Sequence, residues 1–278
     1  MLKSDSYRWS ILLLIVTTLI WGSTFPILKE TVTVLSPTVL VSVRFLIAAL
    51  TLLPFCRHFN WKLARDGTLL GVVVYLSYLT QSLGLLTISS NRAAFITSLN
   101  VILVPLTGIL LGRFVSRQVA IAAGLALAGI GVMSWEGGGL DIGDLWTFGC
   151  ALSYAVYILL MEKIAPQHPP LALTVFQLMA IALLGTLGAL PDLQQQLPLL
   201  QAHWPSVLYL GLFATAGTTW TQAIAQRHIP ATQTAILYTL EPVFASLFAF
   251  WWLGETLGTR GLIGAGMILG AMVLSQRE

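Results

Sequence analysis

Long apolar runs separated by short polar stretches follow one another along almost the whole chain. A helix needs about 20 apolar residues to cross about 30 Å of hydrocarbon, and these runs have that length. They are continuous and rich in Leu, Ala, Gly and Ile, whereas the strands of a membrane β-barrel alternate in polarity. The pattern predicts an all-α integral membrane protein with ten transmembrane helices, near residues 9–28, 37–56, 67–87, 93–112, 118–135, 144–163, 170–190, 205–226, 231–253 and 258–275.

The ten predicted helices read as one five-helix unit that occurs twice, at 9–135 and 144–275, within a single membrane domain 1–278. A shift of 222 − 81 = 141 positions aligns the later parts of the halves, and a shift of 177 − 44 = 133 aligns their opening helices. The shifts differ because the second copy carries a longer predicted loop, around Pro191–Pro205. An odd number of crossings per copy inverts the second copy, as in many secondary transporters. The aligned pairs include Gln81 with Gln222, Leu99 with Leu240, Asn100 with Glu241, Arg44 with Gln177, and Trp21 with Tyr154.

The composition leaves lipid as the only solvent for most of the chain. It is 56% hydrophobic and 9% charged, with a mean hydropathy of +0.84. An ordinary soluble domain carries roughly 25% charged residues, because its exterior must be hydrated. Ten helices and their short connections nearly exhaust the 278 residues, so the sequence predicts no separate soluble domain.

The basic residues gather on one side of the predicted topology, which explains the sequence pI near 9.0 without a nucleic-acid partner. An excess of Lys and Arg marks the cytoplasmic side of a membrane protein. The pattern predicts a multi-pass protein of the cell inner (plasma) membrane with both termini in the cytoplasm. The outer side holds Lys29, Arg92 and Arg260, and the inner side holds Lys3, Arg8, Arg57, Lys62, Arg65, Arg113, Arg117, Lys163, Arg227 and Arg277.

A series of short motifs follows in order along the two halves: Trp21–Pro26, Arg44-Phe45, Ile229–Thr232, Leu240–Val243, Leu253–Leu257 and Gly264–Gly270. In order and spacing they resemble the EamA family of the drug/metabolite transporter superfamily, over essentially the whole chain. The resemblance implies ten helices in two inverted repeats and movement of small metabolites, often export of amino acids or related compounds.

The first half departs from the pattern of the second. Helix four has Asn100-Val101 and Gly112-Arg113 where helix nine has Glu241-Pro242 and Gly254-Glu255. The first half therefore does not duplicate the acidic residues of the second.

Two charges, Arg44 and Glu241, lie well inside predicted helices. A charge at the centre of a membrane helix costs roughly 2.5–3.5 kcal/mol on insertion scales, so such residues usually face a cavity or a partner. As part of a substrate site, Arg44 would attract a carboxylate or phosphate, and Glu241 would bind an amine or carry a coupling proton. The alternative is a structural ion pair between helices.

Polar and aromatic residues within the predicted helices are further candidates for substrate binding. Buried amides in lipid find partners as interhelical hydrogen bonds, so the amides are either helix-joining groups or substrate contacts. The aromatic residues are either packing elements or walls of a site. The amides are Gln81, Asn100, Gln177 and Gln222, and the aromatic residues are Trp21, Tyr78, Tyr154, Trp220 and Tyr238.

Proline and glycine residues predict features of the helices themselves. Pro26, Pro105 and Pro242 should interrupt helices one, four and nine, because proline lacks a backbone N–H. Helices 118–135 and 258–275 are rich in small residues, which predicts packing or dimer-forming elements and not substrate-lining ones.

No motif in the sequence indicates an enzyme, a metal site or a cofactor. It lacks a His-Glu-x-x-His helix, a nucleophile elbow and a nucleotide-binding loop. We therefore expect a secondary transporter that works by alternating access around a midplane site, as a monomer or homodimer. The alternatives are another substrate class, such as a nucleoside, a sugar phosphate or an amphipathic drug, and a membrane scaffold.

Overall fold

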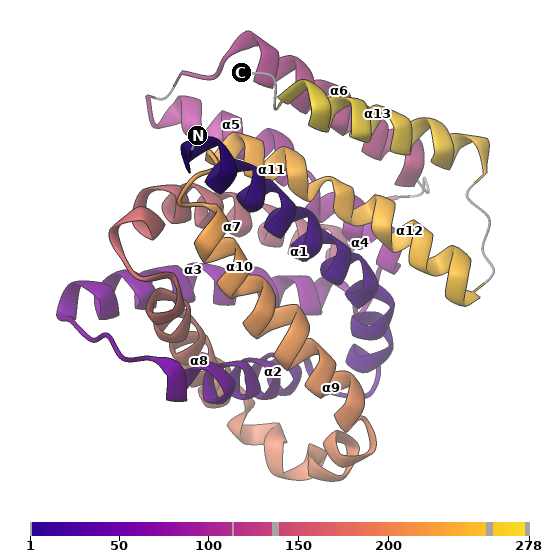
Figure 1. Ribbon diagram of the computed structural model, residues 1–278. Helices are drawn as coiled ribbons and strands as arrows, with labels where there is room; N and C mark the ends of the chain where they lie inside the picture. Colours follow the sequence, from indigo (N-terminus) through magenta and orange to yellow (C-terminus); the bar gives the residue numbers. More distant parts are fainter. Residues whose placement is uncertain (1, 113, 135–138, 254–257, 276–278) are drawn as a thin grey trace.

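The computed structural model describes residues 2–112, 114–134, 139–253 and 258–275, and these residues form helices joined by short turns (Figure 1). Two 3₁₀ turns, Leu53–Phe55 and Ala165–Gln167, and one π-helical turn, η3 (Leu212–Gly217), accompany the α-helices. The α-helices are α1 (Leu2–Val32), α2 (Pro37–Leu52), α3 (Trp61–Gly84), α4 (Ser90–Thr97), α5 (Asn100–Leu110), α6 (Arg117–Ser134), α7 (Ile142–Ile164), α8 (Pro170–Ala202), α9 (Trp204–Gly211), α10 (Thr218–Ala225), α11 (Ala231–Tyr238), α12 (Leu240–Leu253) and α13 (Thr259–Ser275).

The all-α prediction is confirmed for the described residues, and several of their helices are apolar enough to cross a membrane. Five segments qualify by length and composition: 5–32, 37–55, 92–110, 142–167 and 170–202. Arg117–Val132 and Thr259–Ser275 are shorter apolar helices. Residues 113, 135–138, 254–257 and 276–278, which include Gly254-Glu255 of the motif after helix nine, lie outside the described residues.

Polar residues between the apolar runs set where several helices begin. The side chain of Ser36 accepts a hydrogen bond from Val39 N–H, and Pro37 occupies the first turn of α2. Asn60 caps α3 in the same way. Asp141 and Asp144 form a reciprocal capping box at the start of α7. These caps satisfy backbone N–H groups that a helix start leaves without partners.

Helices four and nine of the prediction are each divided into two half-helices. The break between α4 and α5 is at Ser98–Leu99, and the break between α11 and α12 is at Thr239. The 141-residue shift brings these breaks together, although Pro105 and Pro242 do not align. The predictions for Pro26 and Pro105 are wrong, because α1 and α5 each continue through their proline.

The predicted loop around Pro191–Pro205 is also wrong over most of its length. α8 continues through Pro191 and Pro198 to Ala202. Each proline removes one backbone hydrogen bond, but the Leu and Gln residues between them are good helix formers. Gln196 also accepts a hydrogen bond of 2.8 Å from Ser36 N–H, which ties this extension to the start of α2.

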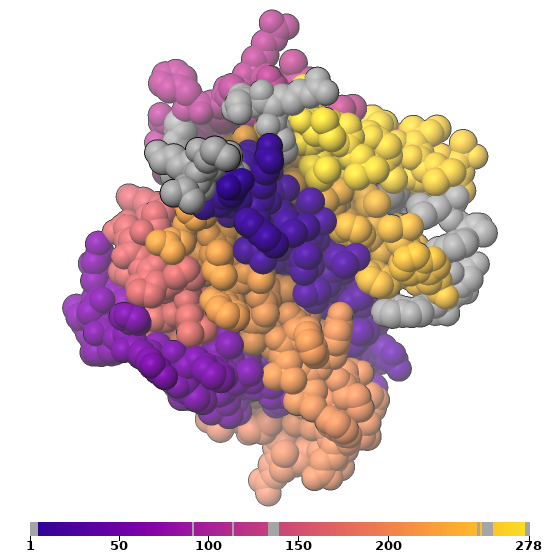
Figure 2. Space-filling view, viewed as in Figure 1, coloured from indigo at the N-terminus to yellow at the C-terminus, as the bar shows by residue number. Residues whose placement is uncertain are grey.

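The helices pack in pairs around a core that draws on both halves of the chain. α2 packs on α8, and α3 packs on both α7 and α8. A Cβ atom added at Gly143 of α7 would lie 2.7 Å from the Gly84 carbonyl of α3, so these helices touch through backbone. On the face shown in Figure 2, α1 lies between α10 and α12 and covers the middle of the molecule.

α6 and α13 form a pair at the edge of the molecule (Figure 1). A Cβ atom added at Gly129 of α6 would lie 2.8 Å from the Gly264 carbonyl of α13. The small residues therefore let the two helices approach closely, and neither helix contributes to the pocket described below.

Candidate functional site

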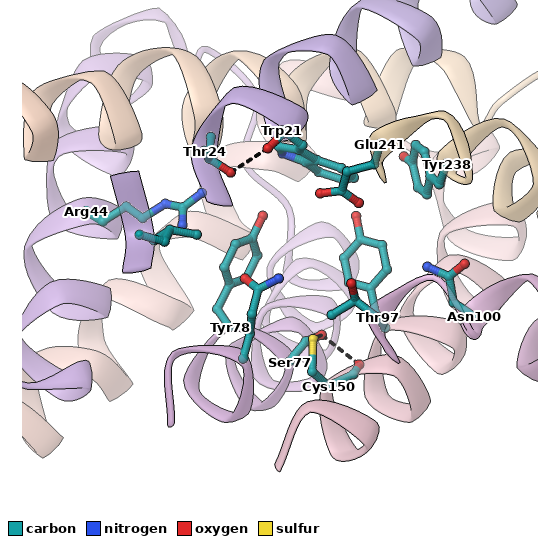
Figure 3. A pocket seen from close by; sticks show the side chains of 13 residues that line it. Trp21, Thr24, Arg44, Ser77, Tyr78, Thr97, Asn100, Cys150, Tyr238 and Glu241 are labelled. Carbon is teal, nitrogen blue, oxygen red and sulfur yellow. Dashed lines mark hydrogen bonds between the residues drawn. The ribbon is translucent and has the colours of Figure 1, made fainter. Parts of the chain in front are cut away.

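A pocket of about 510 Å³, counted to its open mouth, lies where the two halves of the chain meet. Its lining comes from α1, α2, α3, α4, α5, α7, α11 and α12 (Figure 3). The lining residues are Trp21, Thr24, Leu28, Arg44, Ser77, Tyr78, Gln81, Thr97, Asn100, Cys150, Tyr154, Tyr238 and Glu241.

Arg44 of α2 forms the basic edge of this pocket. Its side chain is buried, with 3% of the residue exposed. Its Nε donates to the Thr215 hydroxyl, and its Nη2 donates to the Ala214 carbonyl at 3.1 Å. The guanidinium carbon lies 4.7 Å from the centre of the Tyr78 ring, a cation–π contact. Arg44 is thus held by neutral groups, and its positive charge is not neutralised by a carboxylate of the described residues.

Glu241, in the first turn of α12, forms the acidic edge. Its carboxylate points into the pocket and lies across it from Arg44 (Figure 3). The start of a helix carries partial positive charge, which favours a carboxylate at this position. The sequence left open a structural ion pair between Arg44 and Glu241. The ion pairs of the described residues do not include it.

Three aromatic rings from different helices form one wall. The ring centre of Trp21 lies 5.0 Å from that of Tyr238 and 5.8 Å from that of Tyr154. Tyr154 and Tyr238 are 6.1 Å apart. Such spacing is typical of favourable edge and tilted ring contacts, so the three rings form one continuous aromatic surface.

Two buried polar atoms at the pocket have no hydrogen-bond partner among the described residues. They are Oδ1 of Asn100 and the hydroxyl of Tyr238. A buried polar atom without a partner costs roughly 1–3 kcal/mol, so these atoms are suited to meet a ligand or a water molecule. Asn100 is the counterpart of Glu241 under the 141-residue shift, and both belong to the lining.

The structure brings most of the predicted site residues together and places three elsewhere. Gln222 lies behind the pocket, where it accepts a hydrogen bond of 2.9 Å from the Tyr154 hydroxyl. Gln177 accepts one of 2.7 Å from the Tyr157 hydroxyl and is fully buried. Trp220 is 39% exposed and does not line the pocket. The eight that line it are Trp21, Arg44, Tyr78, Gln81, Asn100, Tyr154, Tyr238 and Glu241.

Five lining residues are absent from the sequence-based set, and helical spacing would have found all of them. Residues three or four apart share a helix face. Thr24 and Leu28 continue the face of Trp21 along α1, Thr97 precedes Asn100 by three, and Cys150 precedes Tyr154 by four. Ser77 precedes Gln81 by four in α3, and its hydroxyl donates to the Cys150 carbonyl at 3.0 Å across the α3–α7 contact.

Polar and charged side chains also pair at the ends of the bundle, away from the pocket. Nε2 of His168 is 2.9 Å from Oδ2 of Asp66, at the start of α3. Arg92 binds both carboxylate oxygens of Asp144 at 2.6 Å. Among the described residues, no group of three or more His, Cys, Asp or Glu side chains is placed to hold a metal ion.

The model of the EamA-like transporter family matches this chain twice, over residues 8–135 and 141–276. A protein named as an uncharacterized transporter of Archaeoglobus fulgidus is 32% identical over 262 residues, which cover 92% of this chain and 82% of that protein. The threonine/homoserine exporter RhtA of Escherichia coli (strain K12) is 26% identical, over 83% of this chain and 78% of its own.

Two further comparisons cover nearly the whole length. An S-adenosylmethionine/S-adenosylhomocysteine transporter of Chlamydia muridarum is 25% identical over 97% of this chain and 92% of its own. A solved crystal structure matches with a TM-score of 0.78 at 18% identity and covers 96% of both chains. At that identity the likeness shows a shared fold.

Proposed function

This chain belongs to the EamA-like transporter family, and we propose that it is a secondary transporter that exports amino acids or related small metabolites. The observation that carries the proposal is one pocket with two opposite charges, Arg44 and Glu241, that do not pair with each other. A zwitterion presents a carboxylate and an ammonium group to such a site. Arg44 would bind the carboxylate, while Glu241 and the side-chain amide oxygen of Asn100 would bind the ammonium.

Alternating access between two inverted five-helix repeats is the mechanism that we propose. It is supported by the two stretches that the family model matches and by a pocket lined from both halves. The matching breaks in helices four and nine also support it, since broken helices often line transporter sites. Tyr7 donates to Gln233, and Gln233 donates to the Ser275 carbonyl, so α1 begins and α13 ends on one side of the molecule. This favours an even number of crossings, with ten as our proposal.

The second candidate substrate is an adenosyl amino acid. The wall of Trp21, Tyr154 and Tyr238 offers aromatic surface for a base, and one relative is named for S-adenosylmethionine. Such a substrate carries the same carboxylate and ammonium groups, so Arg44 and Glu241 would keep the roles given above.

Counterflow in proteoliposomes tests the proposal. Purified protein would be loaded with each of a panel of amino acids, or with S-adenosylmethionine, and uptake of the labelled compound measured. We expect at least one amino acid to be taken up, and Arg44→Ala and Glu241→Gln each to reduce uptake at least tenfold, because each removes a charged contact.

Trp220→Phe is the matched control, since Trp220 lies outside the pocket, and it should retain uptake. Uptake of S-adenosylmethionine alone would favour the second candidate. Uptake of an amino acid that both charge variants leave unchanged would contradict the site.

A further inference from the structure

The helical run from α9 to α10 contains a π-helical turn, η3, beside the basic edge of the pocket. Thr218 N–H donates to the carbonyl of Phe213, five residues earlier, whereas an α-helix pairs residues four apart. A single π-helical turn widens an α-helix locally by one extra residue, and such turns occur often at functional sites. Here the widened turn presents the Ala214 carbonyl and the Thr215 side chain to the interior.

Three side-chain donors meet at the Ala214 carbonyl. Nη2 of Arg44 lies 3.1 Å from it, Nε1 of Trp21 lies 3.3 Å from it, and the Thr218 hydroxyl lies 2.8 Å from it. Arg44 and Trp21 both line the pocket, so one backbone oxygen of the second half of the chain positions two lining residues of the first half.

The Thr215 hydroxyl uses both its hydrogen-bonding functions. It accepts from Nε of Arg44 and donates to the Leu210 carbonyl at 2.7 Å. The side chain is fully buried, so both bonds are shielded from bulk solvent. Arg44 has five N–H donors, of which these contacts with Ala214 and Thr215 occupy two. The others remain for the pocket that Arg44 lines.

The π-helical turn coincides with a one-residue difference between the two halves. Leu70-Gly71 and Leu210-Gly211 are 211 − 71 = 140 positions apart, whereas Gln81 and Gln222 are 222 − 81 = 141 apart. One extra residue therefore lies between Gly211 and Gln222. α3 runs through the corresponding region as an unbroken α-helix.

The packing at the two glycines shows that they lie at matching helix–helix contacts, which we call joints. A Cβ atom added at Gly71 would lie 2.6 Å from the Gln177 carbonyl, and one added at Gly211 would lie 3.1 Å from the Arg44 carbonyl. Gln177 is the counterpart of Arg44. Among the described residues, its side-chain amide bonds to Tyr157 and to the sulfur of Met161, and no hydrogen bond joins it to the backbone of α3. The arginine and the π-helical turn thus occur together, on opposite sides of one joint.

We propose that the extra residue in η3 serves to hold Arg44, with Thr215 as its positioning residue, so that the free edge of the guanidinium is presented to the anionic group of a substrate. This inference rests on the proposed transport function for its substrate and on the contacts above for its geometry. It assigns anion recognition to a joint between the two halves and not to Arg44 alone.

The test compares Thr215→Val, which keeps the shape and removes the hydroxyl, with Thr215→Ser, which keeps the hydroxyl. The probe is whichever labelled amino acid the wild-type protein takes up in counterflow. We expect Thr215→Val to raise KM about tenfold with a smaller change in maximal rate, because an interaction of a charged group is lost. Thr215→Ser should keep KM within about twofold. An unchanged KM in Thr215→Val, or equal damage in Thr215→Ser, would overturn the proposal.

A second measurement does not depend on transport. The Nε–H signal of Arg44 in a ¹⁵N-arginine spectrum of the detergent-solubilised protein can be identified by its absence in Arg44→Lys. We expect this proton to exchange slowly with solvent in the wild type and in Thr215→Ser, and at least tenfold faster in Thr215→Val. Slow exchange without any transport would count against the transport function while supporting the joint. Equal exchange in all three proteins would reject the joint.

Discussion

At the scale of single residues, the most telling feature is that two charges share a pocket without forming a pair. A lone charge in a membrane interior is costly, so its environment must compensate. Arg44 is compensated by the Thr215 hydroxyl, the Ala214 carbonyl and the Tyr78 ring. Glu241 has the start of α12 and an opening into the pocket. The two residues therefore keep their binding capacity for a ligand.

Glu241 is also the residue that would carry a proton if a pH gradient drives transport. Glu241→Gln keeps the size and polarity of the side chain and removes its ability to change charge. We expect this variant to lose stimulation by an imposed pH gradient in proteoliposomes, measured as the ratio of uptake with and without the gradient. Full stimulation in the variant would exclude Glu241 as the proton carrier.

At the scale of helices, close backbone approach decides how the two halves fit together. A Cβ atom added at Gly71 would lie 2.6 Å from the Gln177 carbonyl and 2.7 Å from the Ala180 Cβ atom. Backbone atoms cannot move aside as a flexible side chain can, so α3 and α8 would have to separate. The glycine is therefore required by the contact between helices and not by its own backbone conformation.

Gly71→Ala should destabilise the protein by about 1–3 kcal/mol, the usual cost of overpacking. Gly124→Ala in α6 is the matched control, because a Cβ atom there meets nothing within 4 Å. Alanine is a better helix former than glycine, so the control should be neutral or more stable by up to about 1 kcal/mol. Thermal unfolding in one detergent would compare them, and equal melting temperatures for the two variants would contradict the packing argument.

At the scale of the whole molecule, ion pairs at the ends of the bundle make stability depend on pH. Asp66 lies just before the predicted span 67–87 and contacts His168 and Arg65. Burial by itself would raise the pKa of Asp66, but the hydrogen bonds from His168 and Arg65 outweigh it and hold that pKa below its usual value. A carboxylate with a depressed pKa stabilises the fold above its unfolded-state pKa, about 3.9, and loses this contribution as the pH falls further.

Asp66→Asn should therefore be less stable than the wild type near neutral pH. The difference should shrink as the pH falls below about 4, because Asp66 is then protonated in the unfolded chain before it is protonated in the folded protein. Melting temperatures of both proteins across this range would measure it. A constant difference from pH 7 to pH 3 would show that the Asp66 charge does not contribute to stability.

The sequence by itself determined the all-α class, and among its eleven candidate site residues it named eight that line the pocket, because hydrophobic run length and polar residues within a run are local signals. Only the tertiary structure showed the continuation of α8 through Pro191 and Pro198, the partners of Arg44 and the place of Trp220 outside the pocket. These depend on contacts between segments far apart in the chain. Arg44 and Thr215 are 171 positions apart, a separation at which hydrophobic patterning carries no information about contact.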